Sequence, residues 1–442
     1  MKRLLSNTSW LIANQIFQMV ISFFVGLLST RYLGPTNYGS ITYVGTYISF
    51  FSSFCVLGLD TIIISKLVNY KDRDGEIISS AILLRSIAAI ISIFILNIII
   101  SVADNGDQEI RTIAWLSQFK LLFDAFTSVN YWYQFKLLSK KMVIVDMVAF
   151  VVGNAFRIWM LMTNKNVYWF ATYTSVLCLL NIVVDVPLFL HDCKDKICVS
   201  FSMCKELLRD GIPYMISGIM ISLYSQVDII MIKHMLNGTS YVGYYSAAWS
   251  VCNLVAFIPM AISQSAVPVL LQLKKDNSKN YNNRVTQAIA IIVWIGILYS
   301  CFITCFSNKI VNLLYGKNFM LSANVLKILV WVTLFQNLTK IRDMWFVGEG
   351  QSKLVALYSL LGTLANIVVN YCLIPVLGIY GAALATILTQ TIVTLILPIC
   401  KKETRQYSIN VVRALFLKGI DVKQSAVIVL NLMRGKKSNE SN

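Results

Sequence analysis

The stretch LVALYSLLGTLANIVVNYCL (Leu354–Leu373) contains no charged residue, and YGAALATILTQTIVTLILPIC (Tyr380–Cys400), which follows it closely, contains none either. A hydrocarbon core about 30 Å thick requires roughly 20 apolar residues per helical span. Because lipid satisfies no backbone polar group, apolar stretches of this length must be helices. The two stretches therefore predict two helices that cross a membrane.

The same pattern recurs towards the N-terminus. Hydrophobic residues make up 57% of the chain and charged residues only 13%, whereas a soluble domain carries about 25% charged residues. Further spans are predicted at residues 10–30, 41–59, 78–101, 112–133, 142–162, 168–190, 212–232, 245–270, 286–306 and 323–347. The predicted fold class is an all-α polytopic membrane protein with about twelve transmembrane helices.

The distribution of Lys and Arg in the loops predicts the orientation of these helices. Positive residues are retained on the cytoplasmic side, and alternate connections are rich in them. The opposite connections offer only Arg31, Arg111, Lys165, Lys233, Lys309 and Lys317. This bias predicts that both termini lie on the cytoplasmic side of the membrane, which we expect to be a bacterial inner membrane. The same bias accounts for most of the net charge of +17, so the charge does not require nucleic acid as a partner.

Self-comparison of the chain indicates a duplication. Gly34 and Gly39 match Gly238 and Gly243 at one constant offset, and Asn154 matches Asn366 at a slightly larger one. The predicted organisation is an N-terminal six-helix lobe (1–190), a cytoplasmic linker (191–210), a C-terminal six-helix lobe (211–400) and a basic cytoplasmic tail (401–442) that lies on the inner leaflet. In transporters built from parallel repeats, substrates bind between the halves near the bilayer midplane.

The chain lacks the sequence motifs of several classes of enzyme. The chain has no Walker A sequence, no metalloprotease motif and no nucleophile elbow, and its only histidines are His191 and His234. Cys193, Cys198 and Cys204 lie near His191 in the linker, but zinc motifs favour closely spaced Cys pairs. We therefore expect no catalytic residue, no metal and no cofactor. The first apolar stretch is an ordinary span rather than a cleavable signal peptide.

Four strings resemble a known family. RYLGPTNYG (Arg31–Gly39), GLD (Gly58–Asp60) and DIIMIKHMLNGTSYVGYYSAA (Asp228–Ala248) resemble polysaccharide-export flippases of the Wzx type, in the multidrug/oligosaccharidyl-lipid/polysaccharide superfamily. GEGQSKLVALYSLLGTLANIVVNYCLIPVLGIYGAALATILTQ (Gly348–Gln390) is similar to the eleventh and twelfth helices of that family and is the most specific of the four. The resemblance covers roughly residues 5–400.

The resemblance implies a fold and an activity. The fold would be the two-lobed, V-shaped fold shared by these flippases and the MATE transporters. The activity would be the movement of undecaprenyl-diphosphate-linked oligosaccharide repeat units, such as those of O-antigen or capsule, from the cytoplasmic to the periplasmic leaflet. Partners would be this lipid-linked substrate and membrane lipids, with a polysaccharide polymerase and chain-length proteins as further candidates.

An anionic lipid diphosphate suits a cationic cavity. Charges at membrane depth are costly, and the planar fork of Arg suits phosphate oxygens. The candidate substrate-binding residues are Arg157, Arg85, Asn154, Arg342 and Lys327. Arg157 is the first choice because no acidic residue lies at helical spacing from it and Asn154 shares its face. Each cation has an alternative role, since it could reach the headgroups instead. Asp343 follows Arg342 directly, and we expect poor pairing because adjacent side chains point about 100° apart on a helix.

Other charged residues are candidates for ion coupling or gating, namely Asp228, Asp124, Lys120 and Arg31. A carboxylate that changes partners between two conformations can couple ion entry to substrate movement. Asp228 lies a little over one turn before Lys233, and an ion pair that closes the periplasmic side is the alternative for it. Lys120 and Asp124 are four residues apart, a spacing that favours a structural pair between them.

Two other functions compete with the flippase. An ion-coupled multidrug or small-molecule antiporter of the same superfamily is the first alternative, although a cation-exporting cleft should be mainly acidic. A membrane-embedded polymerase or glycosyltransferase is the second. Such an enzyme would carry a large catalytic loop outside the membrane, and the longest internal loop predicted here has only about twenty residues.

Overall fold

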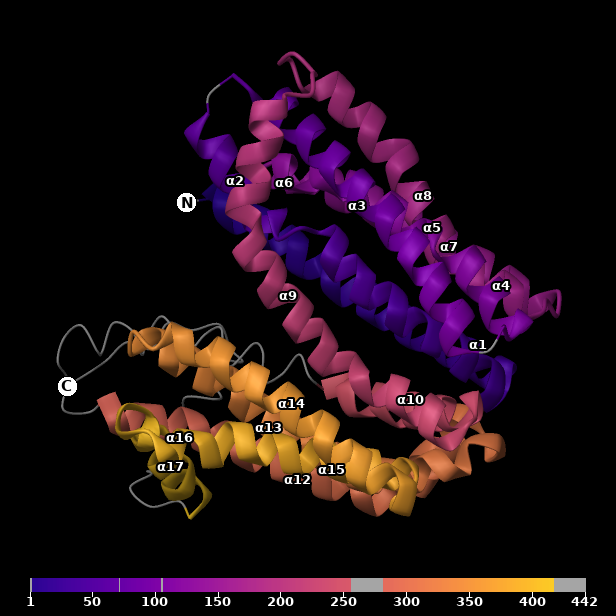
Figure 1. Ribbon diagram of the computed structural model, residues 1–442, viewed down its shortest axis with the longest axis vertical. Helices are drawn as coiled ribbons and strands as arrows, with labels where there is room; N and C mark the ends of the chain where they lie inside the picture. Colours follow the sequence, from indigo (N-terminus) through magenta and orange to yellow (C-terminus); the bar gives the residue numbers. More distant parts are fainter. Residues whose placement is uncertain (1, 71, 105, 256–280, 417–442) are drawn as a thin grey trace. The chain divides into compact units, whose positions relative to one another are not determined.

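The computed structural model describes residues 2–70, 72–104, 106–255 and 281–416, and throughout these ranges the regular structure is helical. The chain divides into two compact units. The first unit comprises residues 1–244 with 314–318, and the second comprises residues 245–313 with 319–442. Figure 1 shows the first unit in indigo to magenta and the second mainly in orange to yellow.

The first unit is a bundle of helices that run back and forth along one direction (Figure 1). Its elements are α1 (Lys2–Cys55), α2 (Leu59–Asn69), α3 (Asp74–Ala103), α4 (Gln108–Ser117), α5 (Phe119–Asp124), η1 (Ala125–Thr127), α6 (Ser128–Phe135), α7 (Ser139–Met162), α8 (Val167–Asp192), α9 (Phe201–Leu236) and the first half of α10 (Thr239–Cys252). Helix α9 packs against α1, α2 and α3. The lobe boundaries expected from the duplication remain a prediction.

The first two predicted spans lie within one element, α1, which bends at Gly34 (φ 70°, ψ 175°) before Pro35. Proline has no N–H to donate and clashes with the preceding turn, so the bend falls where the spans at 10–30 and 41–59 were expected to separate. The second of these spans does not end at Leu59, because α2 continues it to Asn69 after a short break.

The predicted span at 112–133 is interrupted. It consists of α4, α5, η1 and α6, with a 3₁₀ turn at Ala125–Thr127. Polar residues interrupt the same segment in the sequence, and side-chain hydrogen bonds from Thr127 and Ser128 to the carbonyls of Asp124 and Ala125 accompany the tighter turn. Local hydroxyl bonds of this kind compete with regular α-helical pairing.

The second unit contains α12 (Tyr281–Tyr315), which ends in the first unit, η3 (Lys317–Phe319), α13 (Met320–Gly348), α14 (Ser352–Leu377), α15 (Ile379–Thr391), the π-helical turn η4 (Ile392–Ile396), α16 (Leu397–Cys400) and α17 (Lys402–Leu415). Much of the predicted span at 245–270, including the proline expected to bend it, Pro259, lies outside the described residues. Across the described part of the chain, nine helices are long and apolar enough to cross a membrane.

The beginning of the basic tail is helical. The apolar face of α17 packs into the second unit, where Tyr407, Val411 and Ala414 are buried. The Tyr407 hydroxyl donates to the Leu338 carbonyl oxygen at 2.8 Å. The apolar run at 426–433 lies outside the described residues.

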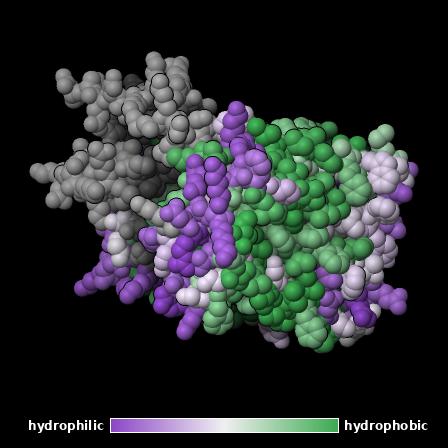
Figure 2. Space-filling view, turned by 90° about the horizontal axis from the view of Figure 1, so that it is seen from above, coloured by the Kyte–Doolittle hydropathy of each residue, from purple (hydrophilic) through white to green (hydrophobic). Residues whose placement is uncertain are grey.

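The helices also carry apolar side chains on their outer surface. On α3, Ile90, Phe94 and Val102 are 60%, 68% and 74% exposed. Figure 2 shows a broad hydrophobic area on the visible face, bordered by hydrophilic residues. A soluble monomer rarely exposes so large an apolar patch, so this surface fits contact with lipid.

Candidate functional site

A break between α1 and α2 creates a pocket in the first unit. Helix α1 ends at Cys55 and α2 begins at Leu59, and between them Leu57 (φ 54°) and Gly58 (φ 65°) adopt left-handed conformations. Such a conformation costs a leucine on the order of 1 kcal/mol or more and persists only where the surroundings impose it.

Close packing against α9 imposes the break. A Cβ at Gly58 would lie 2.5 Å from the Gly211 carbonyl oxygen, and a Cβ at Gly211 would lie 2.5 Å from the Leu57 carbonyl oxygen. Both positions therefore require glycine, because any side chain would push α9 away. The contact brings the break next to the turn of α9 that contains Pro213.

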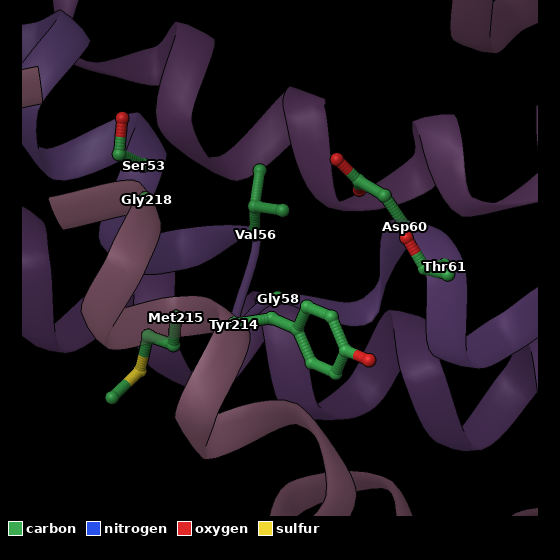
Figure 3. Close-up of a pocket in the computed structure, with 8 residues that line it drawn as sticks. All are labelled: Ser53, Val56, Gly58, Asp60, Thr61, Tyr214, Met215 and Gly218. Atoms are coloured by element: carbon green, nitrogen blue, oxygen red, sulfur yellow. The ribbon is translucent and has the colours of Figure 1, made fainter. Parts of the chain in front are cut away.

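The pocket at this contact has a volume of about 250 Å³. It is lined by Ser53, Val56, Gly58, Asp60, Thr61, Tyr214, Met215 and Gly218 (Figure 3). Asp60 is the charged member of this lining, and Ser53, Thr61 and Tyr214 contribute hydroxyls. Figure 3 shows Tyr214, Met215 and Gly218 on one helix, α9, facing the segment of α1 and α2 that carries the other lining residues.

A polar network lies behind the Asp60 carboxylate. The Tyr131 hydroxyl of α6 donates to Asp60 Oδ1 at 2.5 Å. Arg85 of α3 is only 2% exposed, and its Nη1 donates to Ser128 Oγ at 3.1 Å. Its Nε is buried and has no hydrogen-bond partner among the described residues. A buried, incompletely paired guanidinium is costly, so Arg85 remains a candidate for contact with an anion.

Ion pairs join α2 to α9 near the other end of α2. Lys66 Nζ lies 2.9 Å from both Glu206 Oε2 and Asp210 Oδ2. The Tyr70 hydroxyl also donates to Glu206 Oε2 at 2.9 Å. These contacts hold α2 against α9 on the far side of the break.

The pair predicted between Lys120 and Asp124 is present. Asp124 also accepts hydrogen bonds from Ser52 Oγ at 3.2 Å and from Cys178 Sγ at 3.4 Å. The carboxylate thereby connects α5 to α1 and α8. A gating role for this pair remains a prediction.

Arg157 is half-buried on α7, beside the ring of Tyr173 on α8. Its guanidinium carbon lies 4.8 Å from the ring centroid, a cation–π contact. Its Nε is buried, and no residue in the described part of the chain forms a hydrogen bond with it. Asn154, one turn earlier, is buried and donates to the Phe150 carbonyl, and its Oδ1 is unpaired. Neither residue lines the pocket at the helix break.

A second polar cluster joins the end of α9 to α1. The buried Tyr43 hydroxyl donates to Asp104 Oδ2 at 2.9 Å and lies 2.9 Å from His234 Nε2. Lys233 Nζ lies 3.6 Å from Asp104 Oδ1. The sequence suggested Asp228 on the same helix as a partner for Lys233, whereas Asp104 comes from the end of α3. Asp228 itself is half-buried on α9.

The remaining candidates lie apart from the pocket. Arg31 is exposed on α1, near Gly316. In the second unit, Lys327 of α13 donates to Asn324 Oδ1 at 3.0 Å. Arg342 is fully buried on α13, and its Nη1 donates to the Val393 carbonyl at 2.7 Å.

The expectation of poor pairing between Arg342 and Asp343 is wrong. Arg342 donates to Asp343 Oδ1 from Nε at 2.9 Å and from Nη2 at 2.6 Å. The long Arg side chain curls back to its neighbour, so the angle between the two Cα–Cβ bonds does not decide the contact.

A family model described as "Polysaccharide biosynthesis protein" matches residues 28–324. The chain belongs to the polysaccharide biosynthesis protein family.

Two relatives of this polysaccharide biosynthesis protein carry informative names. The "Probable low-salt glycan biosynthesis flippase Agl15" of Haloferax volcanii is 26% identical over 204 residues, which are 45% of this chain and 42% of that protein. The "Putative O-antigen transporter" of Shigella flexneri is 24% identical over 176 residues, 38% of this chain and 40% of that protein. The matches thus span less than half the length of either relative.

Solved structures establish the fold of this polysaccharide biosynthesis protein. It is similar to lipid II flippase MurJ in an inward closed conformation, with a TM-score of 0.70, 12% identity and coverage of 97% of this chain and 93% of that one. It is also similar to an inward-facing MATE family multidrug resistance transporter (TM-score 0.66, 14% identity, 93% and 99% coverage). These likenesses confirm the predicted all-α, flippase/MATE-like fold class.

The sequence of this polysaccharide biosynthesis protein did not predict the pocket or the Tyr43 cluster. A signal for the pocket was present, because the string GLD that resembles the family contains Gly58 and Asp60. Lys233 and His234 of the Tyr43 cluster lie in another of these strings, but nothing in the sequence pairs them with Tyr43 and Asp104, which lie far away in the chain.

Proposed function

We propose that this protein is a flippase that moves undecaprenyl-diphosphate-linked oligosaccharide repeat units, such as those of O-antigen or capsule, from the cytoplasmic to the periplasmic leaflet by alternating access. The observation that carries the proposal is the position of the pocket. Its lining, residues 53–218, falls within the family match at residues 28–324. The polar pocket thus lies in helices that the family model covers.

Physical chemistry supports a polar path inside the bundle. A hydrated, anionic headgroup cannot cross hydrocarbon unaided, and intramembrane charges usually face a bundle interior or a water-filled cavity. Within the described ranges, Arg157 and Arg85 both keep a buried, unpaired Nε. We propose them, with Asn154, as contacts for the diphosphate. The local partners of Arg342 and Lys327 favour structural roles for these two.

The gate proposed for this transport cycle involves Asp228, Arg31 and the Lys120–Asp124 pair. The Tyr43–His234 contact adds a candidate, because it ties α9 to α1 on the side that the charge bias places in the periplasm. A bistable contact of this kind has to open when the periplasmic side opens. Membrane lipids, a polysaccharide polymerase and chain-length proteins are the proposed partners.

Deletion of the gene tests the proposal. We expect loss of the surface polysaccharide and accumulation of lipid-linked repeat units on the cytoplasmic side, both reversed by the wild-type gene. Normal display without accumulation would refute the flippase. The readouts are surface polysaccharide staining and mass spectrometry of extracted glycolipids.

The second candidate is an ion-coupled multidrug antiporter, favoured by the structural likeness to MATE transporters. It predicts that the deletion strain retains drug more strongly while its polysaccharide stays normal. Uptake of a fluorescent cationic dye by the same strains separates the two functions.

A further inference from the structure

We propose that the pocket at the α1–α2 break is the subsite for a neutral, hydroxyl-rich sugar ring of the substrate, with Asp60 as its hydrogen-bond acceptor and Tyr214 as its stacking surface. This inference rests on the proposed function and deepens it. It assigns the sugar to the pocket lining and leaves the diphosphate to the proposed arginines, of which Arg85 lies in the network behind Asp60.

The backbone of the break argues for a binding site. Non-helical backbone within a membrane protein is tolerated where it is buried or lines a water-filled cavity. In several transporter folds, broken helices form the substrate site because their free backbone groups face the ligand. Here the backbone is strained at Leu57, and the next residue, Gly58, lines the pocket. Strained backbone of this kind clusters at functional sites.

The charge of the lining selects the ligand class. Asp60 carries a negative charge, and none of the eight lining residues is a Lys or Arg. A phosphate would be repelled by this carboxylate. A sugar hydroxyl would instead donate to it, since an ionised carboxylate only accepts hydrogen bonds. Ser53 and Thr61 add hydroxyls that can both donate and accept.

The aromatic side chain fits the same ligand. Tyr214 is 53% exposed although it lies on a membrane-length helix, so the described residues leave about half of its surface uncovered. An aromatic side chain offers an apolar face and, in Tyr, a polar tip. This combination matches a sugar ring, which has an apolar face of C–H groups and a polar rim. The volume of about 250 Å³ suits a single ring.

Tyr131 acts as a positioning residue in this arrangement. Its hydroxyl holds Asp60 Oδ1 from α6, outside the lining of the pocket. The carboxylate therefore keeps a defined orientation while its second oxygen remains for the substrate. Removal of this hydroxyl should weaken sugar binding without a change in the lining.

The experiment compares two lipids on the full-length protein in nanodiscs. One probe is the lipid-linked oligosaccharide fraction extracted from cells that lack the protein, and the other is undecaprenyl diphosphate without sugar. Binding is measured by native mass spectrometry for wild type, Asp60→Asn, Tyr214→Ala, Tyr214→Phe and Tyr131→Phe. Asp72→Asn is the matched control, because Asp72 is an exposed carboxylate outside the pocket whose left-handed backbone Asn tolerates.

We expect Asp60→Asn, which replaces the charged acceptor by a weaker neutral one, and Tyr214→Ala, which removes the stacking surface, to weaken binding of the glycolipid roughly tenfold. Both should leave binding of undecaprenyl diphosphate within about twofold. Tyr214→Phe should retain most of the affinity and Asp72→Asn all of it. Tyr131→Phe should show a smaller loss, confined to the glycolipid.

Two outcomes would overturn the inference. One is an equal loss for both lipids, which would mean that the substitutions disturb the fold or the diphosphate site. The other is unchanged glycolipid binding by both Asp60→Asn and Tyr214→Ala. Failure of the wild-type protein to bind the glycolipid at all would instead refute the proposed function.

Discussion

At the residue scale, two arginines that look alike in the sequence occupy different environments. Arg157 has an aromatic neighbour and an unpaired Nε. Arg342 is surrounded by acceptors and lies 5.6 Å and 5.7 Å from the ring centroids of Phe346 and Tyr358. A hydropathy profile counts each of them as a charge within a span. Of the two, only Arg157 has a hydrogen-bond donor left for a ligand.

Arg157→Ala should therefore reduce polysaccharide export at least about tenfold, the cost of one lost charged hydrogen bond. Arg157→Lys should be milder, since it keeps the charge but not the planar fork. Export is measured as the rate of surface polysaccharide appearance in the complemented deletion strain. Arg111→Ala, at an exposed arginine on α4, is the control. Full export by Arg157→Ala would remove this residue from the site.

Arg342→Ala should lower the stability of the second unit by about 3 kcal/mol, because it leaves the Asp343 carboxylate and the Val393 carbonyl without their donor. The double substitution Arg342→Met with Asp343→Leu should recover much of that loss. Thermal unfolding in detergent measures both, with Lys327→Ala as a control of small effect. An unchanged melting temperature for Arg342→Ala would contradict a structural role.

At the element scale, α1 and α10 cross at two glycines. A Cβ at Gly39 would overlap the Thr239 carbonyl oxygen, and a Cβ at Gly243 would overlap the Pro35 carbonyl oxygen. Gly39 and Gly243 are the residues that match in the self-comparison, and Pro35 and Thr239 match at the same offset. The contact is thus reciprocal, as a two-fold relation between repeats requires. The duplication itself stays a prediction.

Gly39→Ala should accordingly separate α10 from α1 and destabilise the first unit. Gly45→Ala, six residues later on the same helix, should be neutral or slightly stabilising, because nothing lies within 4 Å of its Cβ position and Ala favours helix. The melting temperatures of the two purified variants provide the comparison. Equal values would mean that the crossing contributes nothing.

The contact of α9 with α1 through Tyr43 and His234 should show energetic coupling. Tyr43→Phe and His234→Ala each remove one side of a 2.9 Å hydrogen bond, so their combined effect on unfolding should fall short of the sum by about 1 kcal/mol. Tyr43→Phe with Ser217→Ala should be additive, because Ser217 bonds within its own helix. Additivity in the first pair would show that the contact carries no energy.

At the scale of the whole molecule, the charge bias of the loops predicts the topology. Alkaline phosphatase is active only outside the cytoplasm, so a fusion at Lys165 should be active and a fusion at Lys196 inactive. A fluorescent protein that matures only in the cytoplasm should give the opposite pattern. The reverse result at either position would overturn the predicted orientation.

Several features of this protein were predictable from the sequence because they depend on residues that lie close together in the chain. Apolar runs of membrane length identify helices without knowledge of their neighbours, and Pro35 marks the bend in α1 from its own covalent structure. The Lys120–Asp124 pair follows from helical spacing alone. The strings that resemble the family, GLD among them, pointed to the family that the comparison found.

Other features depend on lateral contacts between helices that are distant in sequence. Tyr131 meets Asp60, and His234 meets Tyr43, only after α6 and α9 have packed against their neighbours. No periodicity encodes such pairs, because they depend on helix rotation and on glycines such as Gly58 and Gly211 that permit close approach. The sequence by itself determined the membrane class and the helices of this protein. Only the tertiary structure decided that the helix break at Leu57 and Gly58 would become a polar pocket.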